Sequence, residues 1–111
     1  PEEEYQKLLI DQAIMECMTN CARHAGGTRV FVKITNNKVL CKVQITNNGK
    51  KPAEGSQEGG GLTSLRKTVE REGGKMQVIF SPEFELILLL SHEKDREIKS
   101  SEEVTVKILN S

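Results

Sequence analysis

The chain has 111 residues, and its sixteen Lys and Arg balance sixteen Asp and Glu, so the formal net charge is zero at pH 7. This length suits one domain, and a neutral chain lacks the basic excess typical of nucleic-acid-binding proteins. The longest apolar run, residues 86–90, is far shorter than the roughly 20 residues of a membrane-spanning helix. We therefore expect a domain with no nucleic-acid partner and no membrane contact. It begins within helical sequence without a Met, which suggests part of a larger protein.

The three cysteines, Cys17, Cys21 and Cys41, are odd in number and include no C-x-x-C pair. This pattern predicts reduced thiols and a cytoplasmic domain, although the parent protein could be membrane-anchored. Cys17, Cys21 and His24 follow one another at helical spacing, so a metal site is conceivable. The two cysteines share the apolar side of the helix, however, and buried cysteine acting as a small apolar side chain is far commoner.

The first half of the chain predicts a helix and a hairpin. Residues 3–24 have the periodicity of one amphipathic helix that ends at Gly26 and Gly27. Its expected apolar face consists of Ile10, Ile14, Cys17, Met18, Cys21 and Ala25. Two alternating stretches, 28–35 and 39–46, then flank the turn residues Asn36 and Asn37. They predict a hairpin whose buried face is formed by Val30, Val32, Ile34, Val39, Cys41, Val43 and Ile45.

The second half begins with a polar, glycine-rich loop, residues 47–61. Leu62, Leu65 and Val69 then recur at helical spacing and predict a short helix that ends at Gly73 and Gly74. Strands are expected at residues 76–80 and 85–91, and the second, apolar on both faces, should be central. A charged linker and a last alternating segment follow. The order predicts an α+β two-layer sandwich, in which helices cover one face of a mixed sheet.

The polar side of the first helix carries four functional groups in one direction: Glu16, Asn20, Arg23 and His24. A carboxamide oxygen suits Mg²⁺, a carboxylate can orient or deprotonate an incoming group, and the two cationic groups can meet phosphate. The same spacing also gives ordinary i,i+3 and i,i+4 pairs on a solvated helix face, and the spacing alone favours that simpler interpretation.

Three glycines, Gly59, Gly60 and Gly61, lead into the second helix. Glycine lets backbone N–H groups approach a ligand, and a helix N-terminus adds partial positive charge, so this segment could bind an anion. The segment is not a Walker A loop, because no Lys-Ser/Thr follows, and no strand leads into it as in a Rossmann fingerprint. A flexible connection is the alternative interpretation.

Three motifs occur in order: Glu16-x-x-Thr19-Asn20-x-x-Arg23-His24-Ala25, Val43-x-Ile45-x-Asn47-Asn48-Gly49, and Gly59-x-Gly61-Leu62-x-x-Leu65-Arg66. Together they resemble the ATP-binding domain of sensor histidine kinases, the Bergerat fold of the GHKL superfamily. The similarity covers about residues 8–90. It is greatest to the short-lid branch, whose sensors signal to response regulators with helix-turn-helix outputs.

The resemblance implies an ATP-binding domain at residues 1–90, a charged linker at 91–103 and an appended C-terminal strand at 104–111. It also implies ATP and Mg²⁺ as cofactors, held between the first helix and a lid at residues 50–58. Catalytic roles near the phosphates fall to four residues, with Asn20 as the Mg²⁺ ligand: Glu16, Asn20, Arg23 and His24. The remaining ATP contacts implied are Asn47, Gly49, Gly59, Gly61 and Leu62.

The implied enzyme is a histidine protein kinase that presents the ATP γ-phosphate to a histidine on a separate dimerisation and phosphoacceptor domain, before transfer to a response regulator. Three departures fall at the adenine end. Asn47 stands where the family has aspartate, Lys51 where it has a second glycine, and residues 83–86 where it has Gly-x-Gly-Thr. They leave two alternatives open: a degenerate, non-catalytic protein-interaction module, or an anti-sigma-factor-type serine kinase of the same superfamily.

Overall fold

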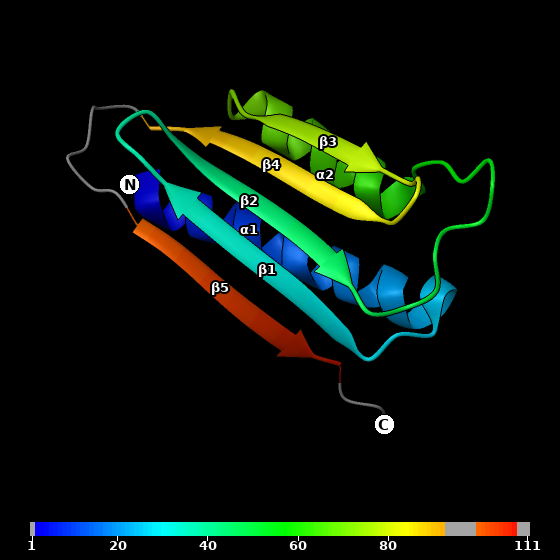
Figure 1. Cartoon of the computed structure of the whole chain (residues 1–111). Coiled ribbons are helices and arrows are strands. Elements are labelled where there is room, and N and C mark those ends of the chain that lie inside the picture. The colour runs from blue at the N-terminus through cyan, green and yellow to red at the C-terminus, as the bar shows by residue number, and fades with distance from the viewer. Residues whose placement is uncertain (1, 93–99, 109–111) are drawn as a thin grey trace.

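A computed structural model describes residues 2–92 and 100–108 of the chain (Figure 1). The elements, in chain order, are α1 (Glu2–Asn20), the π-helical turn η1 (Cys21–Ala25), β1 (Arg29–Asn36), β2 (Leu40–Asn47), α2 (Gly60–Arg71), β3 (Lys75–Ile79), β4 (Glu85–Ser91) and β5 (Ser100–Lys107). The expected helix at 3–24 is thus confirmed, with its last turn wound as a π-helix. Gly26 ends it in the left-handed conformation, at φ 62°.

The five strands form one sheet in the order β3-β4-β2-β1-β5. Every neighbouring pair is antiparallel, so the expectation of a mixed sheet is wrong. The reason lies in where β4 inserts. β2 and β3 point the same way, as strands joined through a helix usually do, but β4 lies between them and runs antiparallel to both. The connection through a helix therefore predicts the relative direction of β2 and β3, but not which strand lies between them.

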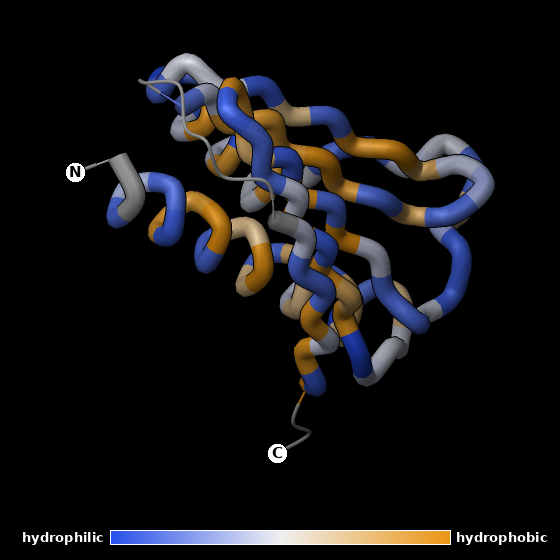
Figure 2. The backbone as a smooth tube through the Cα atoms, turned by 60° about the vertical axis from the view of Figure 1, so that its left-hand side comes forward, coloured by the Kyte–Doolittle hydropathy of each residue, from blue (hydrophilic) through white to orange (hydrophobic). Residues whose placement is uncertain are grey.

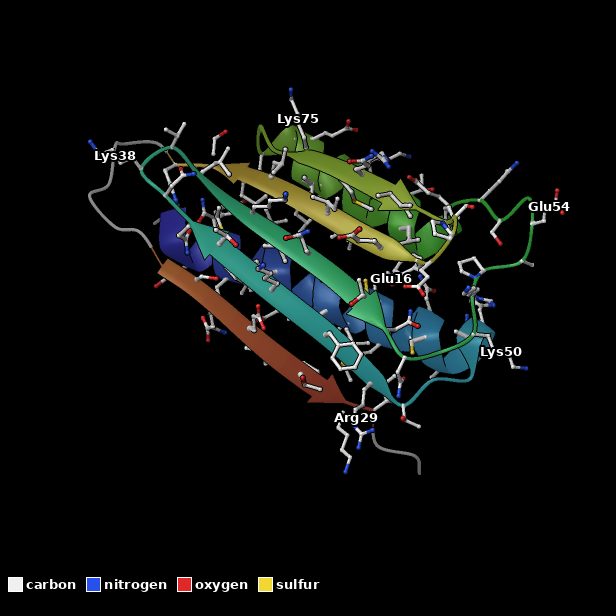
Figure 3. The ribbon with its side chains drawn as sticks, viewed as in Figure 1. Glu16, Arg29, Lys38, Lys50, Glu54 and Lys75 are labelled. Atoms are coloured by element: carbon white, nitrogen blue, oxygen red, sulfur yellow. The ribbon has the colours of Figure 1, made fainter. Side chains whose placement is uncertain are left out.

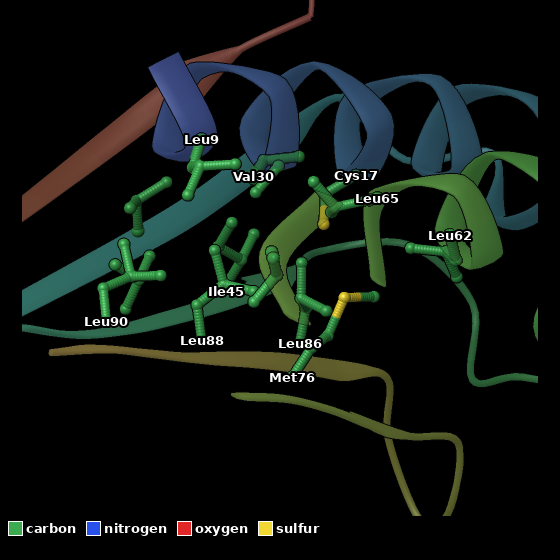
Figure 4. Close-up of a cluster of buried hydrophobic side chains, with 14 of the residues drawn as sticks. Leu9, Cys17, Val30, Ile45, Leu62, Leu65, Met76, Leu86, Leu88 and Leu90 are labelled. Atoms are coloured by element: carbon green, nitrogen blue, oxygen red, sulfur yellow. The ribbon is translucent and has the colours of Figure 1, made fainter. Parts of the chain in front are cut away.

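Both helices lie on the same side of the sheet (Figures 1 and 2), which confirms the two-layer α+β arrangement with one covered face. β4 is an interior strand, as its apolar sequence predicts, and it lies between β2 and β3. Its side chains Leu86, Leu88 and Leu90 are buried beneath the helices (Figure 4). Leu62 and Leu65 of α2 contribute to the same core.

The buried side of α1 differs from the expected one. The fully buried positions are Leu9, Ala13, Cys17 and Cys21, whereas Ile10, Ile14 and Met18 pack partly buried along its flank. The buried face of α1 is therefore rotated by about one residue from the predicted face. Three consecutive apolar residues, 8–10, allow either orientation, and the small side chain of Ala13 lets the helix approach the sheet.

The hairpin faces are confirmed for β1 and for most of β2, but Val39 is 62% exposed. β2 begins only at Leu40 because the amide oxygen of Asn37 accepts hydrogen bonds from the N–H groups of Val39 (2.8 Å) and Leu40 (3.0 Å). This capping lengthens the turn and leaves Val39 in it.

The C-terminal strand belongs to the main sheet. β5 starts at Ser100, four positions before the expected boundary, and pairs antiparallel with β1 along its whole length. Residues 100–103, expected in the linker, are therefore strand, while linker residues 93–99 and the terminal residues 109–111 lie outside the described part. Across 2–92 and 100–108, no helix is long and apolar enough to cross a membrane.

A pair of leucine substitutions tests this core. Leu88 is fully buried, whereas Leu8 is 62% exposed. We expect Leu88→Ala to lower the free energy of unfolding by about 2–5 kcal/mol, because it removes buried methyl groups and leaves a cavity. The control, Leu8→Ala, should change it by less than about 0.5 kcal/mol. Urea denaturation measures both, and equal losses would contradict the packing described here.

Candidate functional site

A cavity of about 470 Å³ lies where the end of α1, the loop after β2, the start of α2 and the β3–β4 turn meet. This volume is in the usual range for small-molecule sites. Its walls are mostly polar on the loop side and apolar on the turn side. The lining residues are Asn20, His24, Ala25, Asn47, Lys50, Lys51, Pro52, Ala53, Ser56, Gln57, Gly59, Leu62, Phe80 and Phe84.

Five of the residues implicated by the sequence meet in this cavity: Asn20, His24, Asn47, Gly59 and Leu62. They come from all three motifs and from separate elements, α1 with η1, the end of β2, and the start of α2. The fold therefore assembles one site from motifs that are far apart in the chain.

The other four implicated residues do not line it. Glu16 lies against Gly61, where an added Cβ would overlap the Glu16 carboxylate, and both residues face a separate groove between α1 and α2. Figure 3 shows Glu16 on α1, away from Lys50 on the loop. Arg23 is exposed. Gly49 packs against η1, where a Cβ would come within 2.5 Å of the Ala25 Cβ.

A close backbone junction holds the end of β2 against η1. The N–H of Lys50 donates to the Ala25 carbonyl at 2.8 Å, and Gly49 leaves room for this approach. Gly27 sits on the other side of the junction, where a Cβ would lie 2.9 Å from both the Asn48 Oδ1 and the Gly49 Cα. Both glycines are thus required by close packing, without any positive φ.

The adjacent asparagines fix the turn after β2. The Asn48 Oδ1 accepts hydrogen bonds from the N–H groups of Thr28 and Arg29, each at 2.9 Å. The Asn47 Oδ1 accepts one from the Gly49 N–H at 2.8 Å, which holds the Asn47 carboxamide at the cavity. Sequence reasoning missed the part played by Asn48, although an Asn-Asn-Gly run is a recognisable turn signal.

The cavity favours an anion. Its lining residues include Lys50 and Lys51 and no Asp or Glu. Glu58, at the end of the same loop, instead pairs with Arg66 of α2, whose guanidinium lowers the pKa of Glu58. Arg66 also donates to the Met76 carbonyl at 2.6 Å. This contact ties the end of the loop to α2 and β3 and keeps the carboxylate away from the lining residues.

The N-terminus of α2 opens into the cavity, since Gly59 and Leu62 both line it. No side chain caps this helix and no acidic residue lies in its first turn. Gly59 has φ −86°, and a Cβ added at Gly59 or Gly60 would meet nothing within 4 Å. Neither backbone conformation nor packing explains these two glycines. Free N–H groups beside open space are what a bound phosphate requires.

An aromatic pair forms the far wall. Phe80 and Phe84 meet edge to face, with ring centroids 5.8 Å apart. They flank residues 81–83 at the β3–β4 turn, in the region where the sequence departs from the histidine-kinase pattern. Sequence reasoning did not single them out, because each looks like an ordinary core residue. Their faces could pack against a planar base.

The cysteines are free and buried, as expected from the sequence. Burial raises the pKa of the Cys17 thiol to about 12, with smaller contributions from the neighbouring Glu16 and Cys21. Burial also raises the pKa values of Cys21 and Cys41. The neutral thiol is thus the stable form. The described residues contain no group of His, Cys, Asp and Glu suited to a metal ion.

The raised pKa of Cys17 predicts that the folded domain loses stability at alkaline pH. Because the folded pKa of Cys17 is about 12 and its ordinary value is 9.0, the stabilisation is complete below 9.0 and is lost as the pH rises towards 12. We expect the free energy of unfolding to fall above pH 9.0 by up to about 1.4 kcal/mol per pH unit from this thiol. Urea titrations should show a shallower fall for Cys17→Ala, and equal slopes would contradict the assignment.

No protein-family model matches the chain. The structure defines a two-layer α+β domain with a five-stranded antiparallel sheet and a cavity of mixed polar and apolar lining beside the loop after β2.

Proposed function

We propose that the chain is the Mg-ATP-binding catalytic domain of a sensor histidine kinase, a short-lid member with the Bergerat fold. It would present the γ-phosphate to a histidine on a separate dimerisation and phosphoacceptor domain, from which a response regulator receives it. The observation that carries this proposal is the convergence of Asn20, Asn47 and Gly59, one from each motif, on a single cavity lined by two lysines.

The phosphate end has the groups that a triphosphate needs. Gly59 and Gly60 leave space at the N-terminus of α2, whose N–H groups would donate to phosphate oxygens. Lys50 and Lys51 add positive charge from the loop. The Asn20 amide oxygen would ligand Mg²⁺, which when bound would neutralise charge on the phosphates.

The adenine end is built differently from the family pattern. Asn47 would accept a hydrogen bond from the adenine amino group through the second lone pair of its Oδ1, since the first already accepts one from the Gly49 N–H. Phe80 and Phe84 would supply the apolar surface that packs against the ring. An uncharged acceptor predicts weaker binding of ATP than an aspartate would give.

The catalytic step depends on Glu16, which lies one helical turn before Asn20 on α1. In phosphoryl transfer the imidazole nitrogen bonds to the γ-phosphorus while the bond to the ADP oxygen breaks, so positioning dominates. Glu16 would orient that imidazole from the groove beside Gly61, and Arg23 and His24 would meet the phosphates from η1. Because Glu16 and Arg23 do not line the cavity, a domain that binds ATP without transferring phosphate is the second candidate.

Calorimetric titration with ATP, in the presence and absence of Mg²⁺, tests the proposal. We expect binding that requires Mg²⁺ and weakens at least tenfold in Asn20→Ala, which removes the metal ligand. Gln12→Ala is the matched control, because it removes a carboxamide from the exposed side of the same helix. Absence of binding at millimolar ATP would overturn the proposal. Binding without phosphoryl transfer to an added phosphoacceptor domain would favour the second candidate.

Substitution of Gly60 separates binding from folding. Gly60→Ala adds a methyl group to open space at the first position of α2, and alanine favours the helical conformation over glycine by at most about 1 kcal/mol. We expect an unchanged or higher melting temperature together with at least tenfold weaker binding of Mg-ATP. Ser64→Ala, on the same helix but away from the cavity, is the control. Unchanged affinity in Gly60→Ala would show that the phosphates lie elsewhere.

Asn47→Asp tests the adenine end. A carboxylate strengthens the hydrogen bond from the adenine amino group, by about 1 kcal/mol, so ATP should bind several-fold more tightly. GTP lacks that amino group and should gain nothing. Competition titrations with the two nucleotides measure the difference. An equal change for both would mean that Asn47 does not contact the base.

A further inference from the structure

The helix α1 carries apolar residues on two different sides. Its inner side packs on the sheet through Leu9, Ala13 and Cys17. On its outer side Tyr5, Leu8 and Met15 are 52%, 62% and 68% exposed. They make up half of the six exposed large hydrophobic residues in the described chain, and all three lie on this one helix. Figure 2 shows α1 at the outside of the molecule, with none of the described strands beyond it.

The outer side also has a regular spacing. Tyr5, Leu8, Gln12, Met15 and Thr19 follow one another at alternating intervals of three and four residues, and we call them the outer stripe. This is the spacing of the positions that face a partner in a coiled coil. At 100° per residue, the stripe points away from the side of α1 that packs on the sheet. Single apolar residues exposed on an ordinary solvated helix are scattered and follow no regular spacing.

A groove runs beside the stripe. It has a volume of about 360 Å³ and lies between α1 and α2, with Gln12, Met15, Glu16 and Thr19 on one side. The α2 side presents Gly61, Ser64 and Thr68 above Leu65. These α2 residues are small or buried and uncharged. A third helix could therefore approach the two helices closely, with its own side chains in the groove.

The charges beside the stripe are mostly acidic. Glu4 and Asp11 flank it on one edge and Glu16 on the other, all within about 80° of its centre. The only cation on the described part of α1 is Lys7, which pairs with Asp11 at 3.0 Å. A second copy packed with its stripe antiparallel would bring these carboxylates together. A helix with Lys or Arg beside its apolar positions would instead be complementary.

We infer that the outer stripe and the groove beside it form a docking surface for an amphipathic helix of a partner protein. That helix carries apolar residues at heptad spacing, and lysine or arginine at the positions that flank them. Its apolar residues cover Tyr5, Leu8 and Met15, and its cations pair with Glu4 and Glu16. None of the stripe residues lines the cavity. The groove, however, contains Glu16 and Gly61, so this surface adjoins the residues that the proposed phosphoryl transfer would use.

Fluorescence anisotropy with a labelled three-heptad peptide tests this surface. The probe has Leu at its two core heptad positions and Lys at the flanking positions, and the comparison peptide has Glu in place of Lys. We expect saturable binding of the Lys peptide, weakened by added salt, and at least tenfold weaker binding of the Glu peptide. Leu8→Ser and Met15→Ser should each weaken binding of the Lys peptide by about tenfold or more, as expected for the loss of one buried apolar side chain.

Val39→Ser is the matched control, because Val39 is 62% exposed but lies in the β1–β2 turn. It should leave peptide binding unchanged. The helical signal in circular dichroism checks that each variant is folded, which the exposure of these residues favours. Equal binding of the two peptides, or full binding to both stripe variants, would overturn the inference. Self-association in sedimentation that the stripe variants abolish, without peptide binding, would also overturn it and assign the stripe to a second copy.

Discussion

The candidate site depends on one contact, the approach of the turn after β2 to the end of the first helix. The Lys50 N–H donates to the Ala25 carbonyl, and Gly27 and Gly49 have no side chain that would prevent this approach. The helix brings Asn20 and His24 to this contact, and the strand brings Asn47 and Lys50. Because both segments are also anchored in the core, through Cys21 and Ile45, the polar groups meet at the rim of a rigid scaffold.

The same contact explains how a neutral chain can present a cationic cavity. Sixteen positive and sixteen negative side chains cancel over the whole sequence, but they are not evenly placed. Lys50 and Lys51 are among the residues that line the cavity, while Glu58 is held by Arg66. Glu4, Asp11 and Glu16 of α1 flank its outer side. Net charge therefore describes the chain as a whole and says little about the local potential at a site.

Much of the fold could be predicted from the sequence. Alternation located β1 and most of β2, an apolar run located β4, and helical spacing located α1 and α2. The errors occurred where local patterns leave two solutions. Three consecutive apolar residues hid the orientation of α1, a side-chain cap displaced Val39, and strand order, which depends on contacts distant in sequence, hid the antiparallel sheet. β5 was expected to start only at residue 104 because the charged residues 102 and 103 resemble linker, although edge strands commonly carry charge.

At the candidate site, the motifs predicted those residues that the course of the backbone brings to the cavity, such as Asn20, Asn47 and Gly59. They did not predict Phe80 and Phe84, which reach the cavity only through the β3–β4 turn, or the Asn48 hydrogen bonds that fix the β2 turn. They also could not show that Glu16 would lie against Gly61 rather than in the cavity. Side-chain direction at these positions depends on tertiary packing that no local pattern encodes.

The central claim is that Mg-ATP binds in the cavity between η1, the loop after β2 and the start of α2. Mapping of amide chemical shifts during a titration with Mg-ATP tests it most directly. The account predicts progressive shifts at Asn20, at Asn47 and along residues 50–62, while the far β1–β2 turn at Lys38 stays unchanged. Shifts confined to other parts of the chain, or none at millimolar nucleotide, would contradict it.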